Sequence, residues 1–287
     1  MAADGGRAGA YKLMSARPFS FFDTRSRRSS LAVGGRVQAR VVAALMIRDA
    51  MGRYGHENLG FFWVIGEPLL LTCGVMALWS ITHQSHNSAV GVVPFALTGY
   101  SMLTMWRLIV FKSMHGMRRS ANLIFHTNIK FFDILLARSL LETIGILAAF
   151  LIAYLPLWLL GFMPSMNDPL ALFGGWLLTA WFAFGFGLII AAATELSDAL
   201  ERFIHPVMYL TLPITGTFYM VDWMPAKIRD ILLYSPLVHG SEMFRSGVFP
   251  PDVVTMYDPW YMVAWCVALT GIGLPLVLYA QRHVQLV

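Results

Sequence analysis

Four ionisable side chains stand inside stretches of sequence that are otherwise apolar, where charges are costly and usually have a function. They are Glu67, Arg107, Arg138 and Glu142. If the apolar stretches are helices that cross a membrane, each of the four lies about two turns in from the end that faces one and the same side. This corresponds to a depth of roughly 9 to 15 Å from that side. Two positive and two negative groups therefore share one level, where they can neutralise one another.

This charge cluster has two interpretations. In the first it only braces three helices, since Arg138 and Glu142 are four residues apart and can pair on one helix face. In the second the two arginines line a cytoplasmic entrance and bind the anionic head group of a lipid-linked cargo, while Glu67 and Glu142 hold them in place. The residue types and spacing are compatible with both.

Motifs for covalent chemistry are absent from the sequence. It contains no G-x-x-x-x-G-K-[ST], G-x-S-x-G or H-E-x-x-H pattern, so we expect no catalytic residue. His83 and His86 are three residues apart, but two ligands are weak evidence, so we expect no metal site. Cys73 and Cys266 each lie in an apolar run and are expected to be packing residues. If ATP drives this protein, a separate subunit must bind it.

The elements that position the charge cluster are membrane helices. Of the 287 residues, 57% are hydrophobic and 13% charged, which is typical of an integral membrane protein. Six apolar runs have the length needed to cross about 30 Å of hydrocarbon, so we expect an all-α fold with six transmembrane helices. The runs are 60–82, 92–114, 134–161, 170–193, 203–221 and 259–281. The fifth is short and contains Pro206, Pro213 and Gly216.

The basic residues predict the orientation. Of the 21 lysines and arginines, 18 lie in the segments on one side of this arrangement, and only Lys227, Arg229 and Arg245 fall on the other. Cytoplasmic segments of membrane proteins are enriched in Lys and Arg, so we expect both termini in the cytoplasm. This asymmetry explains the net charge of +5 without a nucleic-acid partner.

The cytoplasmic side is divided into three parts. Residues 1–35 are rich in Gly, Ser and Arg and are expected to form a flexible tail. Residues 36–58 carry an apolar stripe at four-residue spacing and predict an interfacial helix, which precedes the membrane domain, 59–287. The loop 115–133 mixes basic and apolar residues, so it either rests on the bilayer or inserts a short helix into a soluble partner.

The outer loop 222–258 is long but hardly polar. It predicts two short helices, Pro225–Tyr234 and Pro236–Val248, because proline is favoured in the first helical turn. Each is too short to span a bilayer, so we expect a re-entrant or interfacial pair before the last span. The many aromatic residues of this region fit an anchoring belt at the membrane surface or a platform for stacking sugars.

Several segments resemble one family. They are IRDAMGRYGHENLGFFWVIGEP, FALTGYSMLTMWR, SANLIFHTNIKFFDILLARSLLE, ELSDALERF and SPLVHGSEMFRSGVF. In this order they resemble the permease subunits of ABC exporters for cell-surface polysaccharides, in particular the capsular polysaccharide exporters of Gram-negative bacteria. The resemblance runs from about residue 38, so the first 35 residues fall outside it.

The resemblance implies a transport subunit without enzymatic activity, located in the bacterial inner membrane. Such a permease forms a homodimer and pairs with two copies of a cytoplasmic ATP-binding subunit, which holds the ATP and Mg²⁺; this chain itself would bind no cofactor. The cargo would be a lipid-linked anionic capsular polysaccharide, passed on to a periplasmic adaptor and an outer-membrane export channel. We expect no nucleic-acid partner.

The resemblance also implies two groups of contact residues. Contacts with the ATPase are expected from the interfacial helix and the loop 115–133. These residues are Arg48, Asp49, Arg53, Tyr54, Asn122, Leu123, Phe125 and Phe131. A periplasmic gate or glycan contact is expected from the outer loop. These residues are Trp223, Tyr234, His239, Glu242, Phe244 and Arg245.

Two alternatives stay open. The same topology would suit an export permease for O-antigen, teichoic acid or small molecules. A membrane-embedded transferase acting on a lipid-linked sugar belongs to a different class and would need an exposed acid or histidine at a membrane face, for which Glu142, His239 and Glu242 are the candidates.

Overall fold

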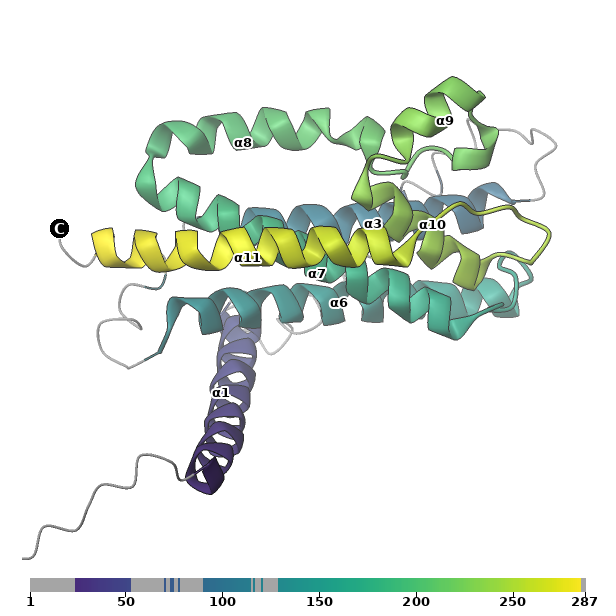
Figure 1. The fold of residues 1–287 in the computed structure, drawn as a ribbon. Coiled ribbons are helices and arrows are strands. Elements are labelled where there is room, and N and C mark those ends of the chain that lie inside the picture. The colour runs from purple at the N-terminus through teal and green to yellow at the C-terminus, as the bar shows by residue number, and fades with distance from the viewer. Residues whose placement is uncertain are drawn as a thin grey trace, which may run out of the picture. The chain divides into compact units, whose positions relative to one another are not determined.

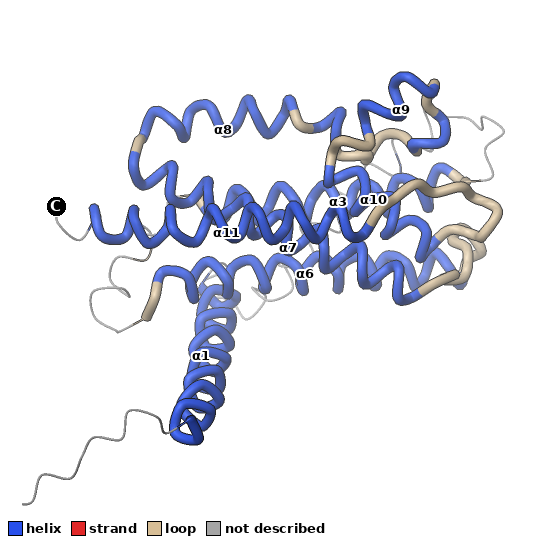
Figure 2. Tube along the Cα trace, in the orientation of Figure 1, coloured by secondary structure: helices blue, strands red, loops and turns tan. Residues whose placement is uncertain are grey.

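The computed structural model describes residues 24–52, 70, 73–74, 77, 90–114, 116, 120 and 129–284, and no strand occurs among them (Figure 2). The helices in chain order are α1 Thr24–Gly52, α3 Val92–Ser113, α6 Phe131–Leu159, α7 Pro169–Leu196, α8 Asp198–Leu210, α9 Ala226–Leu232, α10 Pro236–Val248 and α11 Pro259–Val284. Two short 3-10 turns, Leu212–Ile214 and Val221–Trp223, lie between α8 and α9. The all-α expectation is confirmed for this part of the chain.

The chain divides into two compact units, residues 1–39 and 40–287. The described residues of the first unit, 24–39, are helical, so the helix begins inside the segment expected to be a flexible tail. Its Arg, Ser, Leu and Ala residues are compatible with a helix, and a helix that has formed extends at little further cost. The described part of this helix ends at Gly52, and the last residues of the expected interfacial segment, 53–58, lie outside the described residues.

Four helices are long and apolar enough to cross a membrane, and they match four of the expected runs. They are Val92–Ser113, Phe131–Leu159, Pro169–Leu196 and Pro259–His283. In Figure 1, α3, α6, α7 and α11 run lengthwise beside one another. The loop 160–168, α9 and α10 lie at one end of this bundle, called the outer end here, and α11 finishes at the opposite end.

The two other expected spans, 60–82 and 203–221, are not seen as continuous helices in the described residues. The run 60–82 lies outside the described residues except for Leu70, Cys73, Gly74 and Ala77. The expectation of one continuous helix over 203–221 is wrong, because α8 has 13 residues and ends at Leu210. Pro213 then removes a backbone donor from the helical pattern, and Gly216 has φ of +74°, a conformation that favours glycine.

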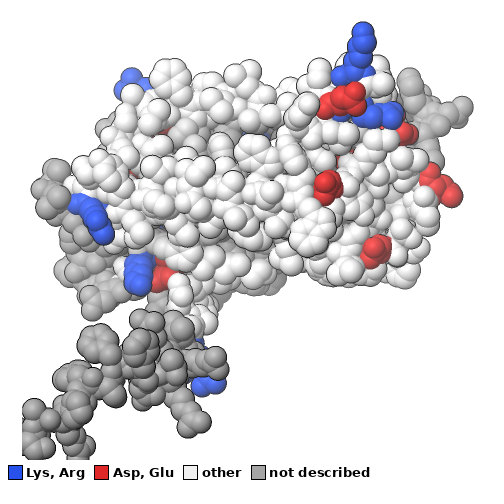
Figure 3. Space-filling view, viewed as in Figure 1, with Lys and Arg blue, Asp and Glu red and all other residues white. Residues whose placement is uncertain are grey.

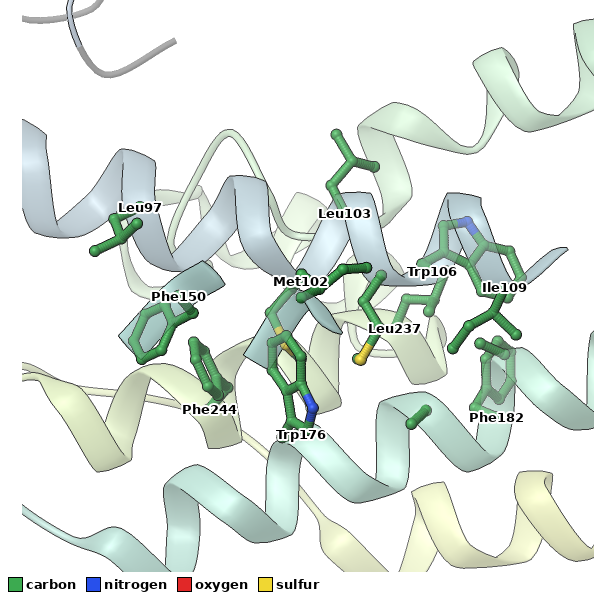
Figure 4. Close-up of a cluster of buried hydrophobic side chains, with 14 of the residues drawn as sticks. Leu97, Met102, Leu103, Trp106, Ile109, Phe150, Trp176, Phe182, Leu237 and Phe244 are labelled. Atoms are coloured by element: carbon green, nitrogen blue, oxygen red, sulfur yellow. The ribbon is translucent and has the colours of Figure 1, made fainter. Parts of the chain in front are cut away.

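The core of the bundle forms around α7, which packs against α3, α10 and α11. The rings of Trp176, Phe244 and Phe150 lie against one another in its outer half (Figure 4), with centroids 5.4 Å apart for the first pair and 5.1 Å for the second. Trp106 of α3 contacts Phe182 of α7 further along, with centroids 5.5 Å apart. Aromatic pairs at these separations contribute beyond the area they bury.

Glycines allow α10 to approach α7 at backbone distance. A Cβ atom on Gly175 would lie 2.5 Å from the backbone nitrogen of Phe244, and one on Gly247 would lie 2.6 Å from the carbonyl oxygen of Asp168. Real Cβ atoms do not come this close to backbone atoms. The short helix α10 is therefore seated against α7 without intervening side chains at these points.

We expect Gly247→Ala to destabilise the protein by about 1–3 kcal/mol, because the added methyl group meets backbone that cannot move aside. The measurement is the midpoint of thermal unfolding of the purified protein in detergent. Gly271→Ala in α11 is the matched control, since its Cβ would meet no atom within 4 Å. An equal midpoint for both variants would contradict the close seating of α10.

Candidate functional site

The outer end contains a buried pair of opposite charges on α10. Glu242 and Arg245 are one helical turn apart, with Oε1 and Nη1 separated by 3.9 Å, and both residues are 0% exposed. A buried charge is stable only when it is paired and hydrogen-bonded. Here the two side chains pair with each other, and backbone groups from outside α10 form hydrogen bonds with both.

Arg245 holds the irregular backbone that follows α8. Its Nη1 donates to the carbonyl oxygens of Gly216 and Tyr219 at 2.6 and 2.8 Å, and its Nη2 donates to that of Thr217 at 2.9 Å. The guanidinium also lies over the ring of Phe95, 4.4 Å from its centroid. Three carbonyl groups that lack helical partners are thereby satisfied by one side chain.

Glu242 holds two further segments. Its Oε1 accepts from the backbone N–H of Val221 at 3.3 Å, and its Oε2 accepts from that of Met256 at 3.1 Å. Burial raises the pKa of this carboxyl, while Arg245 opposes the shift. Burial lowers the pKa of Arg245 to about 10, so the guanidinium stays charged at neutral pH.

Two more α10 side chains extend this network. Ser241 Oγ donates to the carbonyl of Thr215 at 2.8 Å. His239 bonds the carbonyl oxygen of Leu233 through Nε2 at 2.8 Å, and its Nδ1 accepts from the backbone N–H of Asp258 at 2.8 Å, which assigns the Nε2–H tautomer. We call His239, Ser241, Glu242 and Arg245 the α10 clamp.

The clamp changes the interpretation of the predicted outer-end residues. His239, Glu242, Phe244 and Arg245 are all buried in this chain, so they present no surface to a glycan here, and their role in a periplasmic gate or glycan contact stays a prediction. They hold backbone or fill the core instead. The clue in the sequence was the Glu–Arg spacing of three residues within a short helix that follows a segment broken by proline and glycine.

Two predicted outer-end residues are accessible. Trp223 is 46% exposed and lies against Phe95, with ring centroids 5.1 Å apart, and Tyr234 is 77% exposed. Aromatic faces of this kind can stack on sugar rings. Their contact with a glycan stays a prediction.

Charge differs between the two ends of the bundle (Figure 3). Exposed carboxylates gather at the outer end, together with Lys227 and Arg229 of α9. The carboxylates belong to Asp168, Asp222, Asp230, Asp252 and Asp258. Lysines and arginines dominate the described part of the opposite end. They are Lys112, Lys130, Arg202 and Arg282. This distribution agrees with a cytoplasmic assignment for the end where α11 finishes.

Two members of the predicted charge cluster contact residues outside it. The guanidinium carbon of Arg107 lies 5.1 Å from the ring centroid of Tyr209 on α8, a cation–π distance. Arg138 Nε instead contacts Asp49 Oδ2 of α1 at 3.3 Å. Glu142 is buried, and its pairing with Arg138 stays a prediction. Glu67 lies outside the described residues.

The predicted ATPase contacts are described only in part. Phe131 is the first residue of α6 and is 0% exposed, so its side chain is not on the surface of the chain, and its docking role stays a prediction. It belongs to a buried apolar cluster with Leu135 and Leu188. Arg48 and Asp49 are partly exposed near the end of α1. The others, Arg53, Tyr54, Asn122, Leu123 and Phe125, lie outside the described residues.

The geometry gives little support to a transferase. Its three candidates, Glu142, His239 and Glu242, are all buried, whereas such an enzyme needs a group that reaches its substrate. Among the described residues, no group of three His, Cys, Asp or Glu side chains could hold a metal ion. The arrangement is that of a packed helical membrane protein with a braced outer end.

Comparison with known proteins gives a consistent result. The model of the ABC-2 type transporter family matches residues 40–249. The chain is 35% identical over 249 residues to the capsule polysaccharide export inner-membrane protein CtrC of Neisseria meningitidis serogroup B, which covers 87% of this chain and 94% of that protein. It is 34% identical over 263 residues to the capsule polysaccharide export inner-membrane protein BexB of Haemophilus influenzae, covering 92% and 98%. It is 25% identical over 253 residues to the polysialic acid transport protein KpsM of Escherichia coli, covering 87% and 96%.

We expect Arg245→Met to destabilise the protein by about 3–5 kcal/mol, because it leaves Glu242 as an uncompensated buried charge. It also leaves the carbonyls of Gly216, Thr217 and Tyr219 without a donor. The measurements are thermal unfolding in detergent and hydrogen exchange of the 215–222 backbone. The double variant Arg245→Met/Glu242→Gln should lose less than the sum of the single variants.

Arg229→Met is the matched control. Arg229 lies 3.6 Å from Asp222 in the same region, but both side chains are partly exposed, so this pair contributes no more than about 1 kcal/mol. Strict additivity of the two α10 substitutions, or equal losses for Arg229→Met and Arg245→Met, would contradict the role of the clamp.

Proposed function

The chain belongs to the ABC-2 type transporter family, and from this premise we propose that it is the membrane subunit of an exporter for capsule polysaccharide. The observation that carries the proposal is its similarity to the export proteins CtrC and BexB over nearly their whole length. The bundle of apolar helices and the buried state of its candidate acids support transport rather than covalent chemistry.

Membership in this family implies an ATP-binding partner subunit. The sequence supports this, because it has no phosphate-binding loop of its own. In our proposal two copies of the chain form a homodimer that pairs with two copies of the ATPase, which holds ATP and Mg²⁺. The ATPase contacts are Arg48 and Asp49 with their neighbours Arg53 and Tyr54, and the part of the predicted loop 115–133 that precedes α6, residues 115–130.

The orientation follows from charge. The end rich in Lys and Arg lies in the cytoplasm with both termini, and the outer end with its exposed carboxylates faces the periplasm. In our proposal the protein lies in the bacterial inner membrane, as the relatives' names state for them. At the periplasmic face it would meet an adaptor and, through it, an outer-membrane export channel.

The cargo in this proposal is a lipid-linked anionic polysaccharide. A hydrated charged polymer cannot cross hydrocarbon directly, so the passage must be formed by polar and aromatic groups. Closure of the ATPase would displace the cytoplasmic segments and rock the permeases about that passage. At the periplasmic side the exposed rings of Trp223 and Tyr234 would stack on sugars without demanding one sequence of units.

Deleting the gene in its source organism tests the cargo class. We expect lipid-linked capsule glycan to accumulate inside the cell and surface glycan to disappear, because export is the step removed. The glycan is measured by surface immunolabelling and by extraction of the cytoplasmic fraction. Loss of surface O-antigen or teichoic acid with intact capsule would contradict the proposal and favour the alternative exporters.

Site-directed crosslinking tests the ATPase contact. We expect Asn122→Cys and Phe125→Cys to crosslink to cysteines in the groove of the copurified ATPase, because the loop 115–130 is the proposed docking segment. Phe131→Cys should fail to react because this position is buried. Lys227→Cys, exposed at the outer end, is the control that should not crosslink. A crosslink at Lys227 with none at the loop would overturn the docking assignment.

A further inference from the structure

Arg138, near the start of α6, joins two segments that are distant in sequence. Its Nε donates to Asp49 Oδ2 at 3.3 Å, and its Nη2 donates to Ser120 Oγ at 2.9 Å. The side chains of Arg138 and Asp49 are 13% and 15% exposed, and Ser120 is buried. One guanidinium thus contacts both the end of α1 and the region between α3 and α6.

The orientation of Asp49 is set from two sides. Its Oδ1 accepts from Nε of its neighbour Arg48 at 3.1 Å, which leaves Oδ2 facing Arg138. Arginine holds such groups in a fixed planar geometry, whereas a lysine would contact them as a single point charge. The contact between Arg138 and Asp49 therefore fixes the relative orientation of the two side chains as well as the distance between them.

An apolar contact lies next to this polar one. Val42 and Leu45 of α1 pack against Ile134 and Ala137 of α6, and all four are buried. Leu45 is one turn before Asp49, and Ala137 directly precedes Arg138. The second half of α1 is therefore attached to α6 by an apolar patch that ends in an ion pair.

Exposed ion pairs contribute little, but a largely buried pair is costly to break on one side. Breaking the contact between Arg138 and Asp49 would leave a charge at an apolar boundary, so the two helices are expected to move together. α6 has 29 residues and runs along the bundle to Leu159. A displacement of Arg138 therefore moves α6, which is a long and rigid helix.

We propose that Arg138 is a positioning residue that transmits movement of the two ATPase-contact segments to α6. The segments are the end of α1, which carries Arg48, and the loop 115–130, which contains Ser120. This inference rests on the proposed function, since it requires an ATPase acting on these segments. It assigns to Arg138 a coupling role in place of, or in addition to, bracing within the membrane.

The first experiment separates coupling from assembly. The native complex with its ATPase is compared with Arg138→Gln, Asp49→Asn and the double variant, measuring ATP hydrolysis and glycan export in proteoliposomes. We expect export to fall about tenfold in each, with hydrolysis within about twofold of the native rate in Arg138→Gln, and export by the double variant to be no lower than that of either single one. Arg138→Lys should retain part of the export, because it keeps the charge facing Asp49.

Arg282→Gln is the matched control, since Arg282 is an exposed arginine in the last turn of α11. It should export at the native rate. Native export in Arg138→Gln would overturn the proposal. A parallel loss of hydrolysis and export in both Arg138→Gln and Arg138→Lys would overturn it too, because that result indicates a merely structural role.

The second experiment does not depend on the cargo. Spin labels at Met51→Cys on α1 and Ile144→Cys on α6, both exposed positions, report the distance between the two helices in the permease alone. Cys73→Ser and Cys266→Ala remove the native thiols. We expect a narrow distance distribution that broadens in Arg138→Gln and not in Arg282→Gln.

The two experiments distinguish the two proposals. If the native complex hydrolyses ATP without exporting capsule glycan, the proposed function fails, while the spin-label distance still reports the link between α1 and α6. If the distance distribution of Arg138→Gln equals that of the native protein, the link itself is wrong whatever the cargo.

Discussion

A carbonyl group buried away from water needs a hydrogen-bond donor, and the outer end of this protein depends on how one arginine meets that need. After α8 the chain leaves the helical pattern at Pro213 and Gly216, so its carbonyls lose their own donors. Arg245 replaces these donors, and Glu242 keeps the charge of Arg245 balanced. This requirement explains the position of α10, because Arg245 can donate to these buried carbonyls only if the helix that carries it lies inside the fold.

The glycines of α7 and α10 make these hydrogen bonds of Arg245 possible. Arg245 reaches the broken segment only if α10 lies deep against α7, and the bare backbone at Gly175 and Gly247 permits that depth. His239 then connects α10 to the end of α9 through Leu233 and to the start of α11 through Asp258. The outer end is therefore one braced unit, whereas the opposite end is linked through the ion pair of Arg138 and Asp49.

Much of the local structure could be predicted because it depends on nearby residues. Four apolar runs became helices of membrane-spanning length, and the predicted Pro236–Val248 helix has those bounds in the structure. Burial was harder to predict. Phe131 was predicted to lie on a docking surface, because an apolar residue beside a loop suits a partner or a core equally well, and only the tertiary structure shows it in a buried cluster with Leu188.

The sequence by itself determined the membrane class, the all-α fold of the described part and the distribution of charge, since hydropathy and helix-starting prolines act within a few residues. The tertiary structure decided which groups meet. Equal depth along parallel helices leaves the direction around each axis open, so Arg107 faces Tyr209 while Arg138 faces Asp49. Those partners are far away in the chain, 89 residues for Arg138 and Asp49 and 29 for Arg245 and Gly216, and only packing of the helices brings them within bonding distance.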